Sequence, residues 1–500
     1  MLILTADEIR AVEKKCFEYY STEAELMLRA GTACYNEIIK KYNVKGKSIS
    51  VLCGNGKNAG DGFVIARLLN AFGAFAKIVL CDKSPIIAEP LMYYNQALSS
   101  GVASVEYSSE CLNSDFIVDC MFGIGFHGEP RVPFDKIFSE VAECKAVIIS
   151  VDTPSGTNAT TGEICKNCIN ADFTIAVSAL KYCHVLPPAN AYCGEIAVVD
   201  IGIPYDCYTS GYAKTIEFDD VKSCLPERDK NANKGSFGHQ LNICGSYKMF
   251  GAAVIVSKAA LRSGAGLVKL TVPESAYPLA AAHLNQPIFN PVKENDEGTI
   301  SKNAVDDIHD DLLWADSIVI GCGLGVNNDT KAVTQYVLKN SKSPVILDAD
   351  GINCINSSID IFKEIKVPVV LTPHPGEMSR LISKTTAEVQ ANRINIAKSF
   401  ASENNVILVL KGANTVVTDG DAVFVCLTGN PSMAMGGTGD MLSGMIGAFA
   451  AQGIAPLDAA KAAVYIHGLC GDKCAAELSQ RGMTVSDMID RLGTLMSEFE

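Results

Sequence analysis

The sequence predicts an α/β protein of two domains, each with a mostly parallel sheet between helices. Three observations support this. The chain has 500 residues, which is long for one domain. Short apolar runs alternate with helical patterns in both halves. This periodicity breaks between residues 204 and 230, so we expect one domain over 1–212 and another over 213–500.

In the first half, two helical patterns over residues 6–40 precede a series of short strands. The strands are continuous runs of Val, Ile and Leu, which are typical of a parallel sheet buried on both faces. A helix over 62–72 follows the first strand. The predicted strands are 48–53, 76–81, 116–119, 146–152, 172–178 and 195–200.

The second half starts the same alternation again, which predicts a second α/β domain rather than an extension of the first. The predicted strands are 240–244, 267–272, 317–321, 345–348, 369–372, 406–410 and 423–426. The predicted helices are 251–262, 387–403, 440–451 and 456–477.

Composition excludes several classes of protein. The net charge of −14 argues against a nucleic-acid-binding surface, which needs clustered Lys and Arg. No apolar run reaches the roughly 18 residues of a membrane span, and the N-terminus lacks a signal-peptide pattern. The 19 cysteines are scattered through apolar runs, as free thiols are in a reducing compartment. We therefore expect a cytoplasmic protein without nucleic-acid or membrane partners.

Residues 429–444, GNPSMAMGGTGDMLSG, form a glycine-rich segment that runs into an apolar helical pattern. Bare N–H groups and the helix dipole at such a place can hold a phosphate. A carboxylate is costly there unless it takes a proton from a group that attacks the phosphate. The position of Asp440 therefore predicts a general base.

Other C-terminal candidates also lie at strand ends, although the first of them joins a helix to a following strand. The glycine loops over 264–266 and 321–325 are each compatible with a simple turn. His374 stands between two prolines, so its backbone is restricted and its ring is expected to be presented to a ligand. The segment 411–415, KGANT, ends a further predicted strand.

In the first half, three loops follow strands and can meet at the ligand-binding edge of a parallel sheet. The first, over 54–62, carries Asn58 and Asp61 between its glycines, although a tight turn with a capping Asp would also explain it. The others begin at Asp119 and Asp152, and Ser155 belongs to the second of these. Their polar side chains suit a sugar, a phosphate or a cation.

The motifs GNGKNAGDG, DCMFGIGFHGE and DTPSG, in this order, resemble the epimerase domain of bifunctional NAD(P)H-hydrate repair enzymes. The C-terminal motifs resemble the dehydratase domain of the same family, with Ser432 and Met435 departing from its glycine segment. The resemblance spans nearly the whole chain. It implies a Rossmann-like three-layer αβα domain followed by a ribokinase-like αβα domain.

The resemblance also implies an activity for each domain. The first would interconvert the R and S hydrates of NADH and NADPH. The second would dehydrate the S hydrate with ADP, giving AMP and phosphate. It implies K⁺ in the epimerase site, Mg²⁺ in the dehydratase site and a homo-oligomer.

In the epimerase domain, the resemblance assigns K⁺ to Asn58, Asp119 and Ser155, and the reacting ring to Asp152. The implied epimerase substrate-binding residues are Lys57, Asn58, Ala59, Gly60, Asp61, Gly123, Ile124, Gly125, Phe126, His127, Gly128, Glu129 and Asp152. From the residues alone, His127 is better interpreted as structural.

In the dehydratase domain, the resemblance makes Asp440 the catalytic base. The implied substrate-binding residues are Ala265, Gly323, Gly325, His374 and Asp440. The implied ADP-binding residues are Lys411, Gly412, Ala413, Asn414, Thr415 and Gly439.

Two other functions stay open on the sequence. The C-terminal half alone also fits a ribokinase-like small-molecule kinase, here fused to a dinucleotide-binding domain. The N-terminal half could be a non-catalytic module that senses a dinucleotide. The KGANT and HPGE segments favour the repair dehydratase over the kinase, and Asp152 beside the cation-type ligands favours catalysis over sensing.

Overall fold

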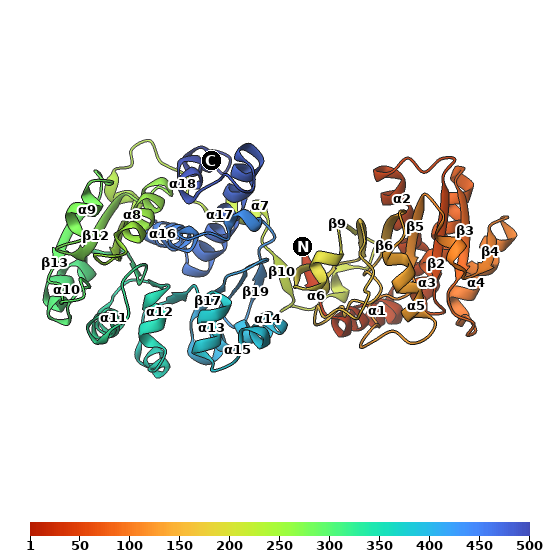
Figure 1. Cartoon of the computed structure of the whole chain (residues 1–500), viewed down its shortest axis with the longest axis horizontal. Coiled ribbons are helices and arrows are strands. Elements are labelled where there is room, and N and C mark those ends of the chain that lie inside the picture. The colour runs from red at the N-terminus through yellow and green to blue at the C-terminus, as the bar shows by residue number, and fades with distance from the viewer. The chain divides into compact units, whose positions relative to one another are not determined.

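A computed structural model describes the whole chain, Met1 to Glu500. It divides into two compact units, Met1–Ala213 and Lys214–Glu500. Each unit has its own parallel or largely parallel sheet with helices beside it (Figure 1). The predicted α/β class, with two αβα domains, is confirmed. No helix combines the length and the apolar character that crossing a membrane requires.

The N-terminal unit is built on a parallel sheet of seven strands in the order β4-β3-β2-β5-β6-β7-β9. The chain moves outward from β2 to β4 and then returns to the other side of β2, so the order reverses between β2 and β5. The strands are β2 (Ser48–Cys53), β3 (Phe75–Leu80), β4 (Ala103–Glu106), β5 (Phe116–Cys120), β6 (Val147–Val151), β7 (Phe173–Val177) and β9 (Glu195–Val199). A short β1 (Leu2–Leu4) pairs in parallel with β8 (Leu180–Lys181).

Helices cover both faces of this sheet because its residues alternate between two cores. On β2, Val51 faces the core formed with α1 to α4, whereas Leu52 faces the core formed with α5. Ile149 and Ile148 on β6 divide in the same way. The helices are α1 (Ala6–Tyr19), α2 (Glu23–Lys41), α3 (Lys57–Phe72), α4 (Ala88–Ser99), α5 (Phe134–Ala142) and α6 (Tyr182–Val185).

The helix α3 begins earlier than predicted. The glycine-rich segment suggested a loop up to residue 62, but Gly56 is the N-cap and the helix starts at Lys57. The polar residues of the motif therefore occupy the first turns of a helix. This decides which of them can face a ligand.

The C-terminal unit has a larger sheet in the order β13-β12-β11-β14-β15-β16-β17-β18-β19-β10. It is parallel from β13 to β17, and β18 runs antiparallel to both of its neighbours. Its order reverses between β11 and β14. The strands are β10 (Ala213–Thr215), β11 (His239–Ile243), β12 (Leu267–Pro273), β13 (Ile288–Val292), β14 (Ser317–Ile320), β15 (Val345–Leu347), β16 (Val369–Leu371), β17 (Ile407–Leu410), β18 (Val416–Thr418) and β19 (Val423–Val425).

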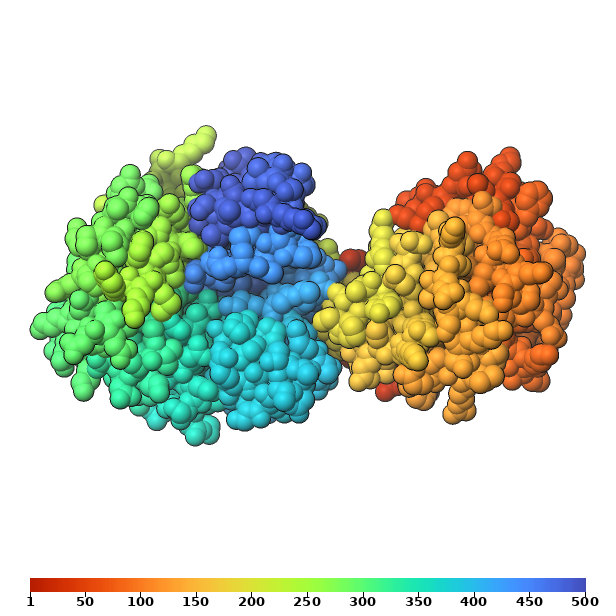
Figure 2. Space-filling view, in the orientation of Figure 1, coloured from red at the N-terminus to blue at the C-terminus, as the bar shows by residue number.

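Twelve α-helices accompany this sheet. They are α7 (Phe218–Cys224), α8 (Phe250–Arg262), α9 (Tyr277–Ala281), α10 (Val305–Trp314), α11 (Asn328–Asn340), α12 (Asp350–Ile355), α13 (Pro375–Leu381), α14 (Thr386–Ala391), α15 (Arg393–Asn404), α16 (Thr438–Ala451), α17 (Pro456–Leu478) and α18 (Val485–Met496). The single helix predicted over 387–403 is two helices, because the backbone of Asn392 leaves the helical region between them. The last two helices of the chain, α17 and α18, pack against each other, and their blue atoms form part of the surface of this unit (Figure 2).

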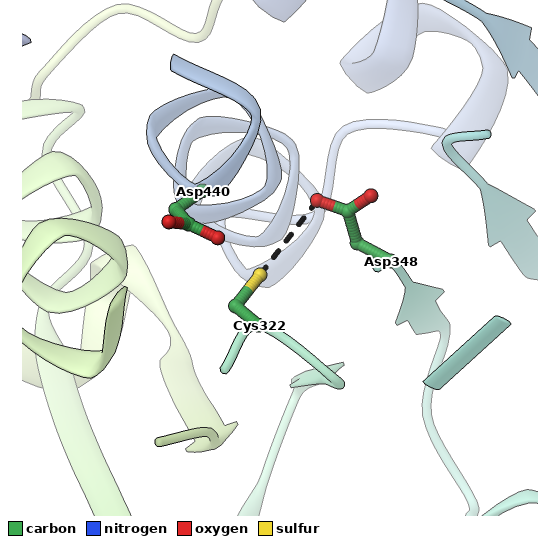
Figure 3. Close-up of side chains that lie close together, drawn as sticks. All are labelled: Cys322, Asp348 and Asp440. Atoms are coloured by element: carbon green, nitrogen blue, oxygen red, sulfur yellow. Dashed lines mark hydrogen bonds between the residues drawn. The ribbon is translucent and has the colours of Figure 1, made fainter. Parts of the chain in front are cut away.

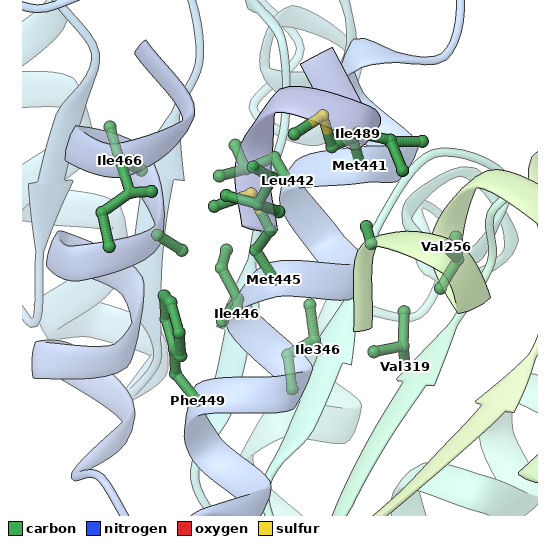
Figure 4. Close-up of a cluster of buried hydrophobic side chains, with 14 of the residues drawn as sticks. Val256, Val319, Ile346, Met441, Leu442, Met445, Ile446, Phe449, Ile466 and Ile489 are labelled. Carbon is green, nitrogen blue, oxygen red and sulfur yellow. The ribbon is translucent and has the colours of Figure 1, made fainter. Parts of the chain in front are cut away.

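The helix α16 is the centre of the C-terminal core. It packs against α8, α17 and the sheet, and its Met445, Ile446 and Phe449 belong to the buried cluster drawn in Figure 4. Every residue from Met441 to Ala451 is buried. A helix that is apolar on all sides needs partners on all sides. The core therefore fixes the position of the glycine segment that opens this helix.

We predict that Gly444→Ala destabilises the C-terminal unit by about 1–3 kcal/mol, the usual cost of overpacking. A Cβ at Gly444 would lie 2.4 Å from the carbonyl oxygen of Val256 on α8. Gly251→Ala, at the start of α8, is the matched control because its Cβ would meet nothing within 4 Å. Urea unfolding measures both, and equal midpoints for the two variants would contradict the prediction.

Candidate active sites

The N-terminal unit has a cavity of about 490 Å³ at the carboxyl edge of its sheet. It lies where β2 and β5 diverge, which is where open α/β sheets bind ligands. Residues that follow three strands line it: Asn58 follows β2, Phe122 and its neighbours follow β5, and Asp152 follows β6. Helices α1 and α2 supply an apolar wall that includes Val12 and Met27.

The cavity brings together some of the predicted binding residues and not others. Those that line it are Lys57, Asn58, Asp61, Gly123, Ile124, Gly125, Phe126 and Asp152. Positions 57, 58 and 61 share one face of a helix, whereas Ala59 and Gly60 turn away. Gly60 faces Met27 of α2, and Ala59 is fully buried. His127, Gly128 and Glu129 are exposed beyond the cavity.

Asp152 has a left-handed backbone, with φ of 69°. Its N–H donates to the carbonyl of Ile175, 2.8 Å away. Its carboxylate accepts a very short hydrogen bond from the ammonium of Lys181, which is 1% exposed, and another from the N–H of Val177. Lys181 also donates to the carbonyl of Val177 over 2.6 Å. The carboxylate is therefore fixed and its negative charge is compensated.

His184 connects the backbones of Lys181 and Asp152. Its Nδ1 accepts from the backbone N–H of Lys181, so the proton sits on Nε2, which donates to the carbonyl oxygen of Asp152. Burial, and then the charge of Lys181, lower the pKa of His184 to about 3. The ring is therefore neutral and holds both backbones without adding charge. Neither Lys181 nor His184 was identified from the sequence.

Two more acids face the same cavity. Burial, and then the charge of Asp152, raise the pKa of Glu13 on α1. The same two causes, followed by Glu13, raise the pKa of Asp61 well above its ordinary value. The cavity thus places the carboxyl groups of Glu13, Asp61 and Asp152 close enough to Lys181 for its ammonium to act on them. Glu13 lies in an ordinary amphipathic helix, which explains why no motif revealed it.

Asn58, Asp119 and Ser155 belong to one hydrogen-bonded cluster. The hydroxyl and the N–H of Ser155 donate to the buried Asp119 carboxylate over 2.6 and 2.8 Å. The amide of Asn58 donates to the carbonyls of Phe122 and Val151 over 3.0 and 3.3 Å. Burial raises the pKa of Asp119, although the two hydrogen bonds from Ser155 lower it. The cluster gathers carboxylate, hydroxyl and carbonyl oxygens, the donors that hard cations use.

In the C-terminal unit, three groups meet at the carboxyl edge of the sheet. Cys322 follows β14, Asp348 follows β15, and Asp440 lies in the first turn of α16. Their side chains point toward one another (Figure 3), and one ligand atom from each lies within 4.8 Å of the others. The thiol of Cys322 donates to Asp348 over 3.7 Å.

Burial, and then the negative charge of Asp348, raise the pKa of Asp440 from 3.8 to about 6. Asp348 itself stays ionised. Burial alone would raise its pKa, but hydrogen bonds from Lys411 over 2.8 Å and Ser443 over 2.7 Å lower it. The two aspartates therefore differ in chemistry: one is held as an anion and the other exchanges its proton near neutral pH.

The predicted nucleotide segment lies beside this pair. Lys411 ends β17 and its ammonium contacts Asp348, which with Glu377 raises the pKa of the lysine against the opposite effect of burial. A Cβ at Gly439 would lie 3.2 Å from the same ammonium. Lys411 and Gly439 are therefore adjacent although 28 residues separate them in the sequence.

The glycine segment is anchored at both ends. The carboxylate of Asp472 on α17 accepts from the N–H of Gly429 and from the side chain of Asn430, each over 2.9 Å. The hydroxyl of Thr438 donates to the carbonyls of Met433 and Met435. The N–H groups that open α16 are thus presented by a loop in a defined shape.

His374 is 52% exposed and caps α13. Its Nδ1 accepts from the N–H groups of Gly376 and Glu377, so its Nε2 is directed outward or toward Glu377. Gly323 and Gly325 lie in the loop after β14, where Gly325 donates to Asp350 over 2.8 Å. These residues share the edge of the sheet that carries Asp440.

The structure does not bring Ala265 to this edge. Ala265 precedes β12, so it lies at the amino edge of the parallel sheet. It packs with Ala448, near the far end of α16, and Asp440 begins that helix. The eight-residue step from Asp440 to Ala448 along this helix spans about 12 Å. Ala265 is therefore not a substrate-binding residue of this site, and Ala252 on α8 lies beside Gly323 instead.

Arg393 is a further residue that the sequence did not reveal. It is 1% exposed, and its guanidinium donates to the carbonyls of Leu410 and Lys411 over 2.9 and 3.2 Å. It also lies against Gly412. Burial lowers the pKa of Arg393 to about 10, so the group remains charged. It fixes the backbone where the segment 411–415 leaves β17.

Comparison with known proteins agrees with this geometry. Residues 241–493 match the family model described as NAD(P)H-hydrate dehydratase, and residues 23–183 match the YjeF-related protein N-terminus. The bifunctional NAD(P)H-hydrate repair enzyme Nnr of Coxiella burnetii is 33% identical over 495 residues, which cover 98% of both chains. That of Escherichia coli is 33% identical and covers 98% of this chain and 93% of its own.

The chain belongs to the family of bifunctional NAD(P)H-hydrate repair enzymes. Its N-terminal unit is the epimerase domain and its C-terminal unit is the dehydratase domain. The predicted activity is therefore confirmed, and the kinase and the sensor are set aside.

A solved structure supports the second half. The ADP/ATP-dependent NAD(P)H-hydrate dehydratase of Bacillus subtilis, co-crystallised with ATP and Mg²⁺, is 32% identical, with a TM-score of 0.51. It covers 57% of this chain and 99% of its own. A ribokinase-like superfamily protein of Enterococcus faecalis, at 24% identity and a TM-score of 0.51, shows the same fold.

We predict that Arg393→Met lowers the free energy of unfolding of the C-terminal unit by about 2–4 kcal/mol, because two buried carbonyls lose their donor. Amide hydrogen exchange over 411–415 should become faster. Arg393→Lys should recover part of the stability, since one ammonium can reach one of the carbonyls. Unchanged exchange in Arg393→Met would show that the guanidinium does not hold this segment.

Proposed function

We propose that Asp152 is the proton-transferring group of the epimerase site and that Asp440 is the base of the dehydratase site. The observation that carries this is that each acid stands at the carboxyl edge of its sheet, beside a second aspartate or a lysine that sets its charge. The nicotinamide hydrate is proposed to occupy the cavity of about 490 Å³ in the N-terminal unit.

In the epimerase site, the ring nitrogen of the hydrate can expel the C6 hydroxyl as water or open the ring. Re-addition to the other face of the planar intermediate inverts C6. Asp152, paired with Lys181, moves the proton. In ring opening it takes the C6 hydroxyl proton and passes it to the ring nitrogen. In loss of water its acid form protonates the leaving hydroxyl, and its carboxylate takes a proton from the water that adds back. Lys57, Asn58 and Asp61, together with residues 123–126, hold the rest of the dinucleotide. The exposed His127, Gly128 and Glu129 stay proposals as contacts with its outer part.

A potassium ion is proposed at the cluster of Asn58, Asp119 and Ser155. The Asp119 carboxylate is buried there, and the carbonyl oxygens of Phe122 and Val151 lie together because both accept from the Asn58 amide. This all-oxygen set fits a hard monovalent cation. Such an ion would fix the loops after β2, β5 and β6 around the cavity.

In the dehydratase site, the C6 hydroxyl of the S hydrate is proposed to be phosphorylated by ADP, because hydroxide is a poor leaving group. Asp440 takes the hydroxyl proton, and the N–H groups of Gly436 to Gly439 stabilise the transferred phosphoryl group. Phosphate then leaves, pushed by the ring nitrogen, and AMP remains. Gly323, Gly325 and His374 are proposed to bind the hydrate.

The nucleotide is proposed to lie along Lys411, Gly412, Ala413, Asn414 and Thr415, with Gly439 close to its phosphates. The contact of Lys411 with the site of Gly439 supports this placement. Magnesium would neutralise charge on these phosphates, which supply most of its ligands. Glu377, buried and close enough to raise the pKa of Lys411, is the acid we place beside it.

A cytoplasmic location and a homo-oligomeric state complete the proposal. All 19 cysteines are free thiols, which fits a reducing compartment. Sedimentation of the full chain tests the oligomeric state.

We predict that Asp152→Asn and Asp440→Asn separate the two activities. Asp152→Asn should reduce the interconversion of the R and S hydrates by about 10²–10⁴-fold, the range for loss of a general acid–base group. Asp440→Asn should reduce ADP-dependent recovery of the NADH absorbance from the S hydrate by a similar factor. Each variant is the control for the other, and full activity in either would remove that assignment.

We predict that dehydration depends on a group with a pKa of about 6. The acidic form of Asp440 cannot accept a proton, so kcat/KM should rise with pH through about 6 and then level off. Asp348→Asn removes the neighbouring charge that raises this pKa, so the rise should move to lower pH. A pH profile unaffected by Asp348→Asn would contradict this assignment.

Protonation of Asp440 itself does not destabilise the fold at low pH. The folded protein holds the Asp440 proton more tightly than the unfolded chain, so this group contributes stability below 3.8, and that contribution is lost as the pH rises through about 6. Stability and activity from this residue therefore change in opposite directions, and a thermal unfolding series over the same pH range checks this.

A further inference from the structure

The group of Cys322, Asp348 and Asp440 contains a thiol that the proposed reaction does not use. The three residues come from the ends of β14 and β15 and from the start of α16, so the sheet and the core helix hold them in place. Cys322 and Asp348 are buried, while Asp440 is half-buried and open to the ligand side. Figure 3 shows the Cys322 sulfur between the two carboxylates.

The charges of this group would balance around a divalent cation. Once a metal displaces the thiol proton of Cys322, the thiolate and the two carboxylates carry three negative charges, and Lys411, bonded to Asp348, offsets one of them. A divalent cation would neutralise the remaining two. Charges of one sign that converge in a buried place are costly unless a cation joins them.

We propose that Cys322, Asp348 and Asp440 form a binding site for a thiophilic divalent cation of the zinc class, and that its occupation blocks dehydration. One thiolate and two carboxylates are ligands that Zn²⁺ accepts, with a fourth position left for water. Around one Zn²⁺ such ligand atoms lie about 3–4 Å apart. The three atoms here are all within 4.8 Å, so small side-chain rotations close the site.

Binding forms a metal–sulfur bond and releases the thiol proton of Cys322 to water. It also engages the carboxylate of Asp440, which can then no longer accept a proton from the hydrate. The inhibitory part of the inference rests on the proposed role of Asp440, but the existence of the site does not.

The thiol separates this site from the magnesium that accompanies a nucleotide. Mg²⁺ prefers six oxygen ligands and does not bind thiolates in proteins, whereas Zn²⁺ and Cd²⁺ do. Loss of the Cys322 thiol should therefore affect zinc and cadmium and leave the requirement for magnesium unchanged.

The test uses the full chain, freed of metal and titrated with Cd²⁺ and Zn²⁺. Formation of cadmium–thiolate bonds is followed by ultraviolet absorbance, and dehydration and epimerisation are assayed in parallel. Cys322→Ser should lose one equivalent of cadmium–thiolate absorbance and should need at least tenfold more Zn²⁺ for half-inhibition of dehydration. Epimerisation in the same samples should show no change between wild type and variant.

The control is Cys224→Ser, a half-buried thiol of the same unit on α7, away from the group. The Zn²⁺ concentration for half-inhibition of its dehydration should equal that of the wild type. Asp440→Asn guards against misfolding of the cysteine variant, because this nearly isosteric change should also weaken cadmium binding.

If Cys322→Ser and Asp440→Asn both bind Cd²⁺ as the wild type does, the inference is wrong, whatever the role of Asp440. If one equivalent of Cd²⁺ binds through the Cys322 thiol but dehydration continues at its metal-free rate, the site stands and the proposed role of Asp440 as base fails. The two failures are therefore distinguishable.

Discussion

A buried ion pair between a lysine and an aspartate stands at the carboxyl edge of each sheet. In the N-terminal unit it joins Lys181 to Asp152, and in the C-terminal unit Lys411 to Asp348. Removal of one partner from such a pair leaves an uncompensated buried charge, which costs about 3–5 kcal/mol. Both sites therefore depend on these pairs for their shape as well as for their electrostatics. The two pairs act differently on the chemistry: the first holds the reacting acid itself, and the second holds the neighbour that raises the pKa of Asp440.

The sheets provide the place for these pairs. In both units the strand order reverses once, between β2 and β5 or between β11 and β14, and the loops after these strands part at that point. The core helix α16 then brings a third element to the C-terminal edge. Because it is buried on all sides, its first turn cannot shift without disturbing the core (Figure 4).

Much of this could be predicted from local sequence. Apolar runs located most of the buried parallel strands. Six others were missed, because very short strands, exposed edges and hairpins carry weak patterns: β1, β4, β8, β10, β13 and β18. Acids directly after strands, such as Asp119 and Asp152, were found for the same local reason. Asp348 has this signal too, directly after the run VIL in VILDAD, and was overlooked as a site residue.

Residues that act across the fold were harder to predict. Lys181 is the only charged residue in TIAVSALKYCHVL, and a lone lysine in so apolar a stretch indicates a buried, paired ammonium. No local pattern shows that its partner is Asp152 or that Glu13 faces the same cavity. Ala265 was assigned to the substrate by the family resemblance, although its glycine turn precedes a strand and so lies at the edge of the sheet opposite to Asp440. Residues 57–61 were expected to form a continuous contact loop. Because α3 already begins at Lys57, only one face of its first turns reaches the cavity.

The left-handed backbone of Asp152 limits how this position can evolve. Few side chains tolerate a φ of 69°; asparagine and aspartate do so more readily than most, and glycine does so freely. Of these, aspartate alone carries a negative charge for Lys181. The backbone and the ion pair therefore select the same residue independently, so a glutamate could not take over even though it offers the same functional group. An epimerase built on this turn has one acid open to it, and any drift toward a different acid would first require the turn itself to be rebuilt.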